Sequence, residues 1–563
     1  MLHESIIDPD WEAARAPVTG ADGLRWVYDF GAGVAEGHGG MAAELGNKGA
    51  GLAEMAQLGV PVPPGFTIVA EASRHHRANA GAFPPGLVAQ VEEALRRLEG
   101  TAGAGFGALG RPLLVSVRSG ARASMPGMMD TILNLGLTDA TVQGLAAASG
   151  DARFAYDCYR RLVQTYGAVV QGVDAHLFDA ALESHKEDRG LARDADLTAG
   201  DWRAVVAAWQ DIIEREAGEP FPQDPRTQLF GAIGAIFRSW GNARAVAFRA
   251  MHGIPDDWGT AATVQCMVFG NRGTDSGTGV AHSRDPATGE PGLCGEFLSD
   301  AQGEEIVSGL RTPGPLADGP QSLEAAAPAA FAELRGIADR LERHFGDMQE
   351  IEFTVQQGRL FILQTRSGKR SVEANVRIAT DMAEAGLITR AEAVRRADLS
   401  ALKDRLRPVP DPDAPRTVIA TGLPASPGAA TGVAVFTSED AVRIAADGSP
   451  VVLCRPETSP HDVHGMQAAC AIVTARGGAT SHAATVARAM GRPCVAGARA
   501  LRIDPAQGTM TVGDHRVQAG DTITVDGTTG EVILGAVPML EPETPPAVAL
   551  LLGWARELGL SAE

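Results

Sequence analysis

TARGGATSHAATVARAMGRPCVAG, residues 474–497, is the segment on which the fold prediction rests. The apolar residues 471–473 just before it predict a strand that ends at residues 476–478, Arg-Gly-Gly. The Ala-rich sequence that follows predicts a helix terminated by Gly491 and Pro493, with Thr480 or Ser481 as its N-cap. His482 then lies in the first helical turn, where unpaired backbone N–H groups and the helix dipole favour an anion.

A histidine at this place is suited to carry a phosphoryl group, because neutral imidazole is nucleophilic and its pKa lies near working pH. The alternative from the residues alone is a histidine that only caps its helix. The segment closely resembles the phosphohistidine motif of the pyruvate phosphate dikinase and phosphoenolpyruvate synthase family. This resemblance implies that His482 is the catalytic residue, phosphorylated and shuttled between two distant sites.

Length and charge limit the class of protein. The chain has 563 residues, which is too long for one core and predicts two to four domains. A formal net charge of -20 argues against nucleic-acid or anionic-membrane partners. No run of about 18 apolar residues and no signal-peptide pattern is present, and the six cysteines are scattered without C-x-x-C spacing. We therefore expect a cytoplasmic protein with reduced thiols.

Two basic residues in the first quarter of the chain are candidates for phosphate binding. Lys48 follows Gly46 and Asn47 and precedes a predicted helix, so its ammonium group could reach a phosphate. Arg118 is expected at the tip of a strand over residues 113–117, followed by a loop rich in Met, Gly and Pro. Solvated side chains are the alternative for both. Around these residues the sequence resembles the nucleotide-binding domain of pyruvate phosphate dikinase, which implies that both contact ATP.

The segment DMQEIEFTVQQGRLFILQTRSGKR, residues 347–370, predicts a hairpin with polar residues on one face. Glu350 and Glu352 are two residues apart on a strand and therefore share a face, so they could hold Mg²⁺ against nucleotide phosphates. A solvated charged face is the alternative. The segment resembles the carboxyl half of an ATP-grasp fold, which implies a metal and nucleotide role for Glu352 and Gln364 and a phosphate role for Arg366. We also expect Glu304, Glu305, Gln364 and Arg366 to bind ATP and phosphate.

The predicted fold class is α/β and multidomain. Residues 1–369 form an ATP-grasp nucleotide-binding domain with a helix-rich part at about 140–252, where Arg160 and Arg161 either face phosphate or, as we favour, pack structurally. Residues 370–412 form a helical linker ending in a Pro/Asp-rich stretch, residues 413–537 a swivelling β/β/α phosphohistidine domain, and residues 538–563 a C-terminal connector helix. The resemblance to dikinases also implies regulatory phosphorylation of Thr480.

Members of this family continue into a pyruvate-binding barrel, which needs roughly 250 residues, whereas 28 follow Gly535 here. We therefore expect a dikinase-like phosphotransferase that converts ATP and orthophosphate to AMP, pyrophosphate and phospho-His482. Pyruvate would be phosphorylated to phosphoenolpyruvate on a separate barrel chain, docked by an exposed apolar face of the C-terminal helix. The alternatives are transfer to another small-molecule acceptor, or a nucleotide-binding homologue with a regulatory role. Drug-phosphorylating relatives insert a domain for which residues 370–412 leave no room.

Overall fold

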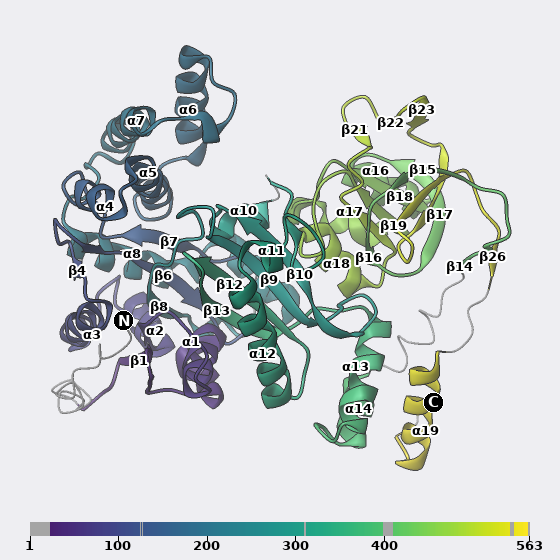
Figure 1. Cartoon of the computed structure of the whole chain (residues 1–563), viewed down its shortest axis with the longest axis horizontal. Coiled ribbons are helices and arrows are strands. Elements are labelled where there is room, and N and C mark those ends of the chain that lie inside the picture. The colour runs from purple at the N-terminus through teal and green to yellow at the C-terminus, as the bar shows by residue number, and fades with distance from the viewer. Residues whose placement is uncertain are drawn as a thin grey trace. The chain divides into compact units, whose positions relative to one another are not determined.

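The computed structural model describes residues 23–123, 125, 128–308, 311–397, 409–540 and 545–560. The predicted polar lead-in over residues 1–20, residues 398–408 of the predicted linker and residues 124, 126 and 127 of the loop after Arg118 lie outside these residues. The chain divides into two compact units, Met1–Val268 and Phe269–Glu563. The boundary falls inside the predicted nucleotide-binding domain, between its two sheets (Figure 1).

An antiparallel sheet forms the centre of the first unit. Its central strands are buried on both faces: Val115 and Val117 are buried, and so are Ser116 between them and Thr263 on the next strand. The strands, in spatial order, are β2 (Val34–Ala35), β1 (Val27–Gly31), β3 (Gly65–Ile68), β8 (Ala261–Cys266), β6 (Val115–Gly120) and β7 (Thr131–Leu135). A short pair, β4 (Gly105–Phe106) and β5 (Pro112–Leu113), lies outside this sheet.

Helices cover this sheet and extend from it. Those that pack on the sheet are α1 (Ala42–Gln57), α2 (Ala70–Ala78), α3 (Leu87–Ala102) and α8 (Pro225–Ser239). The predicted helix-rich part is confirmed as α4 (Thr141–Ser149), α5 (Ala152–Val169), α6 (Ala175–Arg189), α7 (Ala199–Ala217), α8 and α9 (Ala243–His252). Figure 1 shows α5, α6 and α7 grouped together. Arg160 and Arg161 both pair with the buried carboxylate of Asp157 on their own helix, which supports the structural interpretation.

The second unit begins with a five-stranded antiparallel sheet. In spatial order its strands are β11 (Gly314–Pro315), β10 (Pro291–Ser299), β9 (Gly277–Arg284), β12 (Gln349–Gln356) and β13 (Arg359–Ser367). Helix α12 (Pro328–Phe345) packs against β9, β12 and β13, while the short helices α10 (Gly303–Ser308) and α11 (Leu323–Ala326) lie in the connection between β10 and α12. The predicted hairpin over residues 347–370 is confirmed as β12 and β13.

The third sheet is mixed and carries the His482 segment. Its order is β15 (Thr417–Thr421), β25 (Glu531–Leu534), β24 (Thr522–Asp526), β17 (Ala429–Val435), β18 (Val451–Arg455), β19 (Ala471–Thr474), β20 (Cys494–Ala496) and β16 (Leu423–Ser426). The strands from β17 to β20 run parallel, and the rest pair antiparallel. The predicted strand at residues 471–473 is therefore confirmed as β19.

Alternation along these strands produces two separate cores. Val451 and Leu453 of β18 pack with α16 (Ser438–Ala446), α17 (Val463–Ala468) and α18 (His482–Met490) on one face. Val452 and Cys454 of the same strand face the other core, which also contains Met510 and Val517. That side is covered by a small sheet of β21 (Arg502–Asp504), β22 (Thr509–Val512) and β23 (His515–Gln518). Helix α18, which begins with His482, is thus fixed on a sheet buried on both faces.

Three helices of the second unit pack on one another: α13 (Val372–Glu384), α14 (Arg390–Arg396) and α19 (Pro546–Glu557). Val548, Leu551 and Trp554 of α19 are buried against residues of α13 and α14 that include Val376 and Val394. The prediction that the C-terminal helix exposes an apolar docking face is therefore wrong. Its apolar residues follow a helical stripe, but the stripe is covered by the chain's own linker helices.

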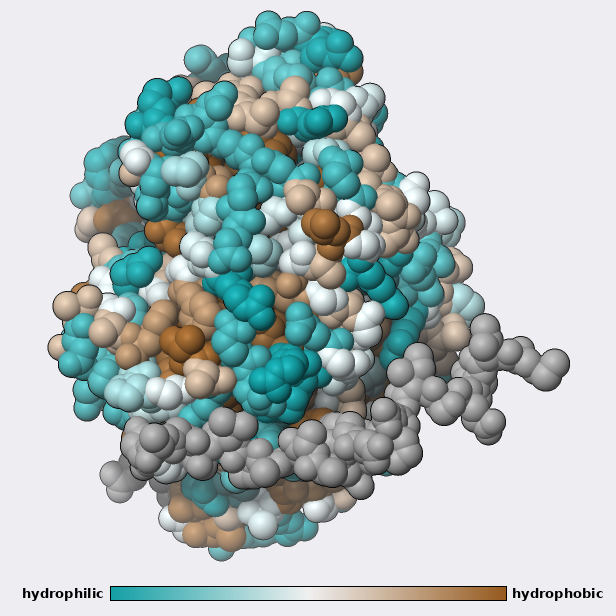
Figure 2. Space-filling model, turned by 90° about the vertical axis from the view of Figure 1, so that its left-hand side faces the viewer, coloured by the Kyte–Doolittle hydropathy of each residue, from teal (hydrophilic) through white to brown (hydrophobic). Residues whose placement is uncertain are grey.

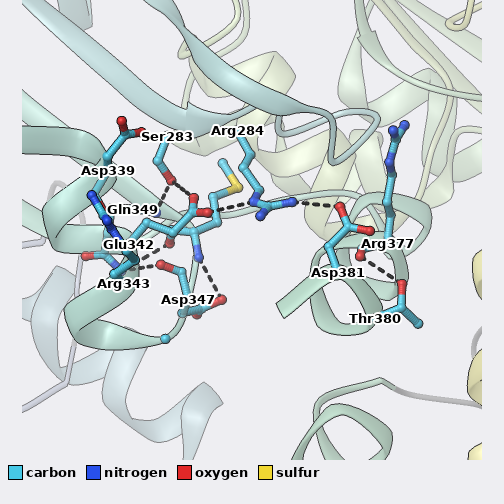
Figure 3. Close-up of polar contacts among 12 residues, drawn as sticks. Ser283, Arg284, Asp339, Glu342, Arg343, Asp347, Gln349, Arg377, Thr380 and Asp381 are labelled. Carbon is cyan, nitrogen blue, oxygen red and sulfur yellow. Dashed lines mark hydrogen bonds and ion pairs between the residues drawn. The ribbon is translucent and has the colours of Figure 1, made fainter. Parts of the chain in front are cut away.

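A buried ion-pair network holds α13 to the five-stranded sheet (Figure 3). Arg284, at the end of β9, donates to Glu342 Oε1 of α12 at 2.9 Å and to Asp381 Oδ2 of α13 at 2.8 Å. Ser283 donates to the other oxygen of Glu342 and accepts from the backbone N–H of Gln349, the first residue of β12. Residues 370–397 of the predicted linker are consequently helical and firmly packed.

The surface is mixed in character. On the face drawn in Figure 2, hydrophobic residues occur in small groups separated by hydrophilic ones. Exposed large apolar residues such as Leu109 and Met251 are far apart in the sequence. None of the helices in the described part of the chain has both the length and the apolar composition needed to cross a lipid bilayer.

Candidate active site

His482 is the first residue of α18, and the N-cap is Ser481, whose Oγ accepts from the backbone N–H of Ala484 at 3.4 Å. This confirms one of the two predicted caps. The imidazole is half-buried, and its Nδ1 lies 3.2 Å from Thr458 Oγ1. Burial lowers the pKa of His482 below its ordinary value; nearby Asp462 opposes this effect and Lys369 adds to it. At neutral pH the ring is therefore uncharged and keeps a lone pair for nucleophilic attack.

The loop before His482 is held from two directions at one residue, Ala479. Its N–H donates to Glu296 Oε1 at 2.6 Å, and its carbonyl accepts from Arg488 Nη2 at 2.7 Å. Glu296 belongs to β10, whereas Arg488 is a buried residue of α18. Gly478 has no room for a side chain, because a Cβ placed there would lie 1.8 Å from Glu296 Oε1.

Thr480 completes this contact by donating its hydroxyl to Glu296 Oε2 at 2.7 Å. Glu296 therefore uses both carboxylate oxygens on two consecutive residues of the phosphohistidine loop. Nothing in the sequence pairs Glu296 with a threonine 184 positions away. Only the folded chain shows this contact.

The β12–β13 hairpin presents its four predicted residues in two directly opposed pairs. Glu350 faces Arg366, and Glu352 faces Gln364. The next register pair skips Leu363, so the ladder is irregular immediately beyond Glu352. Glu350 is buried and accepts from Arg366 Nε at 2.9 Å. Burial alone would lower the pKa of Arg366, but the charges of Glu350 and Glu352 outweigh it and raise the pKa.

Lys369, just after β13, is a basic residue that the sequence did not single out. Burial lowers its pKa, and the neighbouring charges of Arg366 and Arg488 lower it further while Glu350 opposes them. Lys369 also lowers the pKa of His482, so the end of the hairpin lies close enough to the imidazole for their charges to interact. In the sequence, Lys369 is indicated only by its place in the run Ser-Gly-Lys-Arg, residues 367–370, at the end of the hairpin.

Glu350 and Glu352 are suited to bind the Mg²⁺ ion that accompanies a bound nucleotide. Among the described residues, no group of three or more His, Cys, Asp or Glu side chains is placed to hold a metal ion. Mg²⁺ at phosphate sites takes one or two carboxylates and fills its remaining positions with water and phosphate oxygens. Glu350 and Glu352 satisfy that need, although Glu350 already carries Arg366 as a partner.

Of the two predicted glutamates on α10, Glu305 has partners within its own unit. Its Oε1 accepts from the backbone N–H of Gln302 at 3.2 Å, and its Oε2 lies 3.3 Å from Arg311. The backbone of Glu304 lies in the same helix, and its side chain is outside the described part. The contacts of Glu305 stabilise the start of α10, and a role in ATP or phosphate binding stays a prediction.

Lys48 lies just after a kink in the first unit. Helix α1 starts at Ala42, and at Gly46 the backbone leaves helical geometry with a φ of 67°. A Cβ at Gly46 would lie 1.9 Å from the carbonyl oxygen of Gly120, so only glycine fits. The N–H of Asn47 donates to Ala121 O at 3.0 Å. The prediction that Lys48 precedes a helix is therefore wrong: Lys48 lies within α1, just after the kink, and beside the end of β6.

Arg118 is half-buried inside β6, with two further residues of the strand after it. Its register partners are Thr131 on β7 and Thr263 on β8. The prediction that the strand ends at Val117 and presents Arg118 at its tip is therefore wrong. The cause is the sequence that follows: small residues allow the backbone to stay extended and paired through Gly120.

The first unit thus brings Lys48 and Arg118 to the same edge region of one sheet. The second unit brings His482, Thr480, Lys369 and the β12–β13 residues together. The predicted roles of all these residues in ATP, metal or phosphoryl binding stay predictions that this arrangement supports.

Comparisons with known proteins match two parts of the chain, and the first match crosses the boundary between the two units. Residues 77–322 and 319–386 match the family model "Pyruvate phosphate dikinase, AMP/ATP-binding domain". Residues 448–530 match "PEP-utilising enzyme, mobile domain", which covers His482. The first match spans the helix-rich part and both antiparallel sheets in part, and the second lies within the mixed sheet. The predicted α/β multidomain fold class is confirmed.

Relatives with the same organisation occur in bacteria and plants. The chain is 52% identical over 539 residues to the pyruvate, phosphate dikinase of Rhizobium meliloti (strain 1021), which covers 94% of this chain and 60% of the relative. It is 46% identical over 534 residues to the enzyme of Clostridium symbiosum, with 94% and 60% covered, and 48% identical to the chloroplastic enzyme of Flaveria pringlei, with 94% and 55% covered. The chain thus spans somewhat more than half the length of these relatives, and it belongs to the pyruvate, phosphate dikinase family.

Proposed function

We propose that this chain phosphorylates His482 at the expense of ATP and orthophosphate and then passes the phosphoryl group to pyruvate. The observation that carries the proposal is the uncharged, half-buried imidazole at the start of α18, placed next to a charged hairpin inside a segment that matches the mobile domain of this family. Thr458 engages Nδ1, so Nε2 is the nitrogen that takes the phosphoryl group.

The first half-reaction is balanced as ATP, orthophosphate and His482 giving AMP, pyrophosphate and phospho-His482. As the ring nitrogen bonds to the β-phosphorus, the bond between that phosphorus and the oxygen bridging to the α-phosphate breaks, and AMP leaves with this oxygen. Orthophosphate attacks the γ-phosphorus, whose bond to the oxygen bridging to the β-phosphate breaks, so pyrophosphate leaves and the β-phosphoryl group stays on His482. The ring nitrogen attacks with its lone pair, and the N–H of the other nitrogen stays in place. Catalysis of this kind is mostly positioning and neutralisation of charge.

The binding residues follow the predictions. Lys48 and Arg118 of the first unit and Gln364 and Arg366 of the hairpin contact nucleotide phosphates, and Glu304 and Glu305 belong to the same ATP and phosphate site. Glu350 and Glu352 hold Mg²⁺, which supplies positive charge to the phosphate oxygens when bound. Support comes from the shared face of the carboxylate pair and from the placement of Lys48 beside β6.

For the acceptor we propose pyruvate, bound on a barrel that lies outside residues 1–563, where phosphoenolpyruvate forms. In support, the relatives are longer than the matched segment, and their names give pyruvate as a substrate of those enzymes. The test is to mix the phosphorylated chain with pyruvate, with or without the C-terminal remainder of the Rhizobium meliloti enzyme. Phosphoenolpyruvate only in the presence of that remainder supports the proposal, and its formation by the chain alone contradicts it.

The domain limits that we propose are a nucleotide-binding domain over residues 1–369, a linker over 370–412, a mobile domain over 413–537 and a connector helix over 538–563. The family models support the first and third of these. A cytoplasmic location is supported by the six cysteines, all of which are free thiols.

Regulatory phosphorylation of Thr480 is part of the same proposal. Its hydroxyl donates to Glu296, so a phosphate there would set a dianion against a carboxylate. Phosphopeptide analysis of the chain from its host, together with a Thr480→Val variant that resists inactivation, tests this point. Absence of the phosphopeptide under all growth conditions would refute it.

The decisive experiment incubates the pure chain with Mg²⁺ and ATP labelled on its β-phosphate, with and without orthophosphate. We expect AMP, pyrophosphate and one acid-labile label per chain, all dependent on orthophosphate. His482→Ala should abolish the label, whereas His464→Ala, an exposed histidine of the same domain, should keep it. Label on the His482→Ala chain contradicts the assignment, and label independent of orthophosphate contradicts the dikinase reaction.

A further inference from the structure

Glu296 hydrogen-bonds the five-stranded sheet to the loop before His482. It lies on β10, and its two carboxylate oxygens accept from Ala479 N–H at 2.6 Å and from the Thr480 hydroxyl at 2.7 Å. The side chain of Glu296 is buried, so these two hydrogen bonds are shielded from water. Charge-assisted hydrogen bonds of this length are about twice as strong as neutral ones.

The loop is shaped to accept this carboxylate. Gly478 leaves space that any side chain would fill, since its Cβ would meet Glu296 Oε1 at 1.8 Å. On the other side of the same peptide, the buried guanidinium of Arg488 donates to Ala479 O at 2.7 Å and to Ala425 O at 2.9 Å. Arg488 therefore fixes the loop to its own domain, while Glu296 is the contact that joins the loop to the other sheet.

The donors that Glu296 occupies belong to a region that attracts anions. They precede the N-terminus of α18, where the helix dipole and unpaired N–H groups favour negative charge. His482 follows Ala479 by three residues, so the two lie within roughly 10 Å of each other along the chain. A phosphoryl group on His482 adds a second anion to this region, at a distance over which charges are little screened.

We propose that Glu296 is a positioning residue that acts as a charge-operated latch: it holds the loop in place for phosphorylation of His482, and the new phosphoryl group displaces it. This inference rests on the proposed phosphorylation of His482. The latch ties release of the mobile domain to completion of the chemistry. Before transfer the carboxylate and the loop attract each other, and after transfer the carboxylate faces a phosphoryl dianion.

Three variants separate the parts of this idea. Glu296→Gln keeps the shape and removes the charge, and Glu296→Ala removes both. Glu290→Gln is the matched control, because Glu290 stands just before the same strand but pairs with Arg377 at the exposed surface. Single-turnover kinetics should show that Glu296→Ala slows phosphorylation of His482 about tenfold at saturating ATP while the Kd for ATP is unchanged. An unchanged rate overturns the positioning role.

Release is measured by hydrogen exchange of the amide of Ala479, before and after His482 is phosphorylated with phosphoramidate, which needs no ATP site. In the wild-type chain we expect exchange to accelerate about tenfold or more on loading, the loss of one charge-assisted hydrogen bond. Glu296→Gln should show no such jump, Glu296→Ala should exchange fast from the start, and Glu290→Gln should behave as wild type. His482→Ala, treated identically, should not change.

Several results would overturn the latch. One is an amide of Ala479 that stays protected in the loaded wild-type chain, and another is a Glu296→Gln chain that releases as fully as wild type. Because loading is chemical, failure of ATP to label His482 refutes the proposed function without affecting this test. Conversely, ATP-dependent label without any change in exchange refutes only the latch.

Discussion

Replacing Arg284 with alanine should destabilise the second unit strongly, because its guanidinium is 8% exposed and joins three elements. Without it, Glu342 of α12 keeps its charge at 13% exposure, and Ser283 is its remaining donor among the described residues. Breaking one side of a buried ion pair costs about 3–5 kcal/mol. Asp381 is 32% exposed and can be hydrated once Arg284 is removed, so losing its ion pair adds little to the destabilisation.

This cost can be followed as a thermal shift. For a unit of this size, 1 kcal/mol corresponds to about 1.5–2 °C, so Arg284→Ala should lower the Tm of the second unit by about 5–10 °C. Arg377→Ala is the matched control on α13, since Arg377 and Glu290 form an exposed pair worth about 0–1 kcal/mol. Calorimetry of both variants, and of Glu342→Gln alone and with Arg284→Ala, gives the coupling energy. A Tm for Arg284→Ala within about 2 °C of the control, or additive effects in the cycle, would refute the network.

Three further predictions concern the site. Because burial lowers the pKa of His482 below its ordinary value of 6.5, the rate of phosphohistidine formation should fall to half its maximum at a pH below 6.5. A half-maximal pH at or above 6.5 in single-turnover assays contradicts this. Gly46→Ala should weaken ATP binding at least about tenfold in calorimetric titration, because its Cβ would lie 1.9 Å from a backbone carbonyl oxygen. Gly59→Ala is the control, since Gly59 has a similar φ of 69° and open space around it, so the substitution should cost only roughly 1 kcal/mol of backbone strain. Equal ATP affinity in both variants would show that the kink does not place Lys48. Glu352→Gln should raise the Mg²⁺ concentration needed for half-maximal labelling by about tenfold, and Glu305→Gln should leave it unchanged; the reverse order would move the metal to α10.

Local patterns predicted much of the fold. The strand at residues 471–474, the cap at Ser481 and the stop at Gly491 all follow from neighbouring residues, and the structure has each of them. The opposed pairs on β12 and β13 follow from the two-residue period of a hairpin. These features depend on interactions a few residues long, which a single sequence displays.

Contacts between distant segments were not predictable in the same way. The bond from Thr480 to Glu296 joins residues 184 positions apart, and no local pattern marks them as partners. The apolar stripe of α19 was evident, but whether it would face solvent or the linker helices depends on tertiary packing. Arg118 was misplaced because its strand continues through small residues that carry weak strand propensity but find partners on β8.

The mixed-sheet domain begins and ends at one point. Val409 and Pro410 of β14 (Val409–Pro410) pair with Leu540 and Met539 of β26 (Met539–Leu540), so the chain enters and leaves through adjacent strands. A module whose two ends meet can be excised, moved into another gene and inserted into a surface loop without stretching its host. The same property makes residues 409–540 suitable for expression alone or for circular permutation. Evolution can therefore recombine this domain with different partner domains at little structural cost.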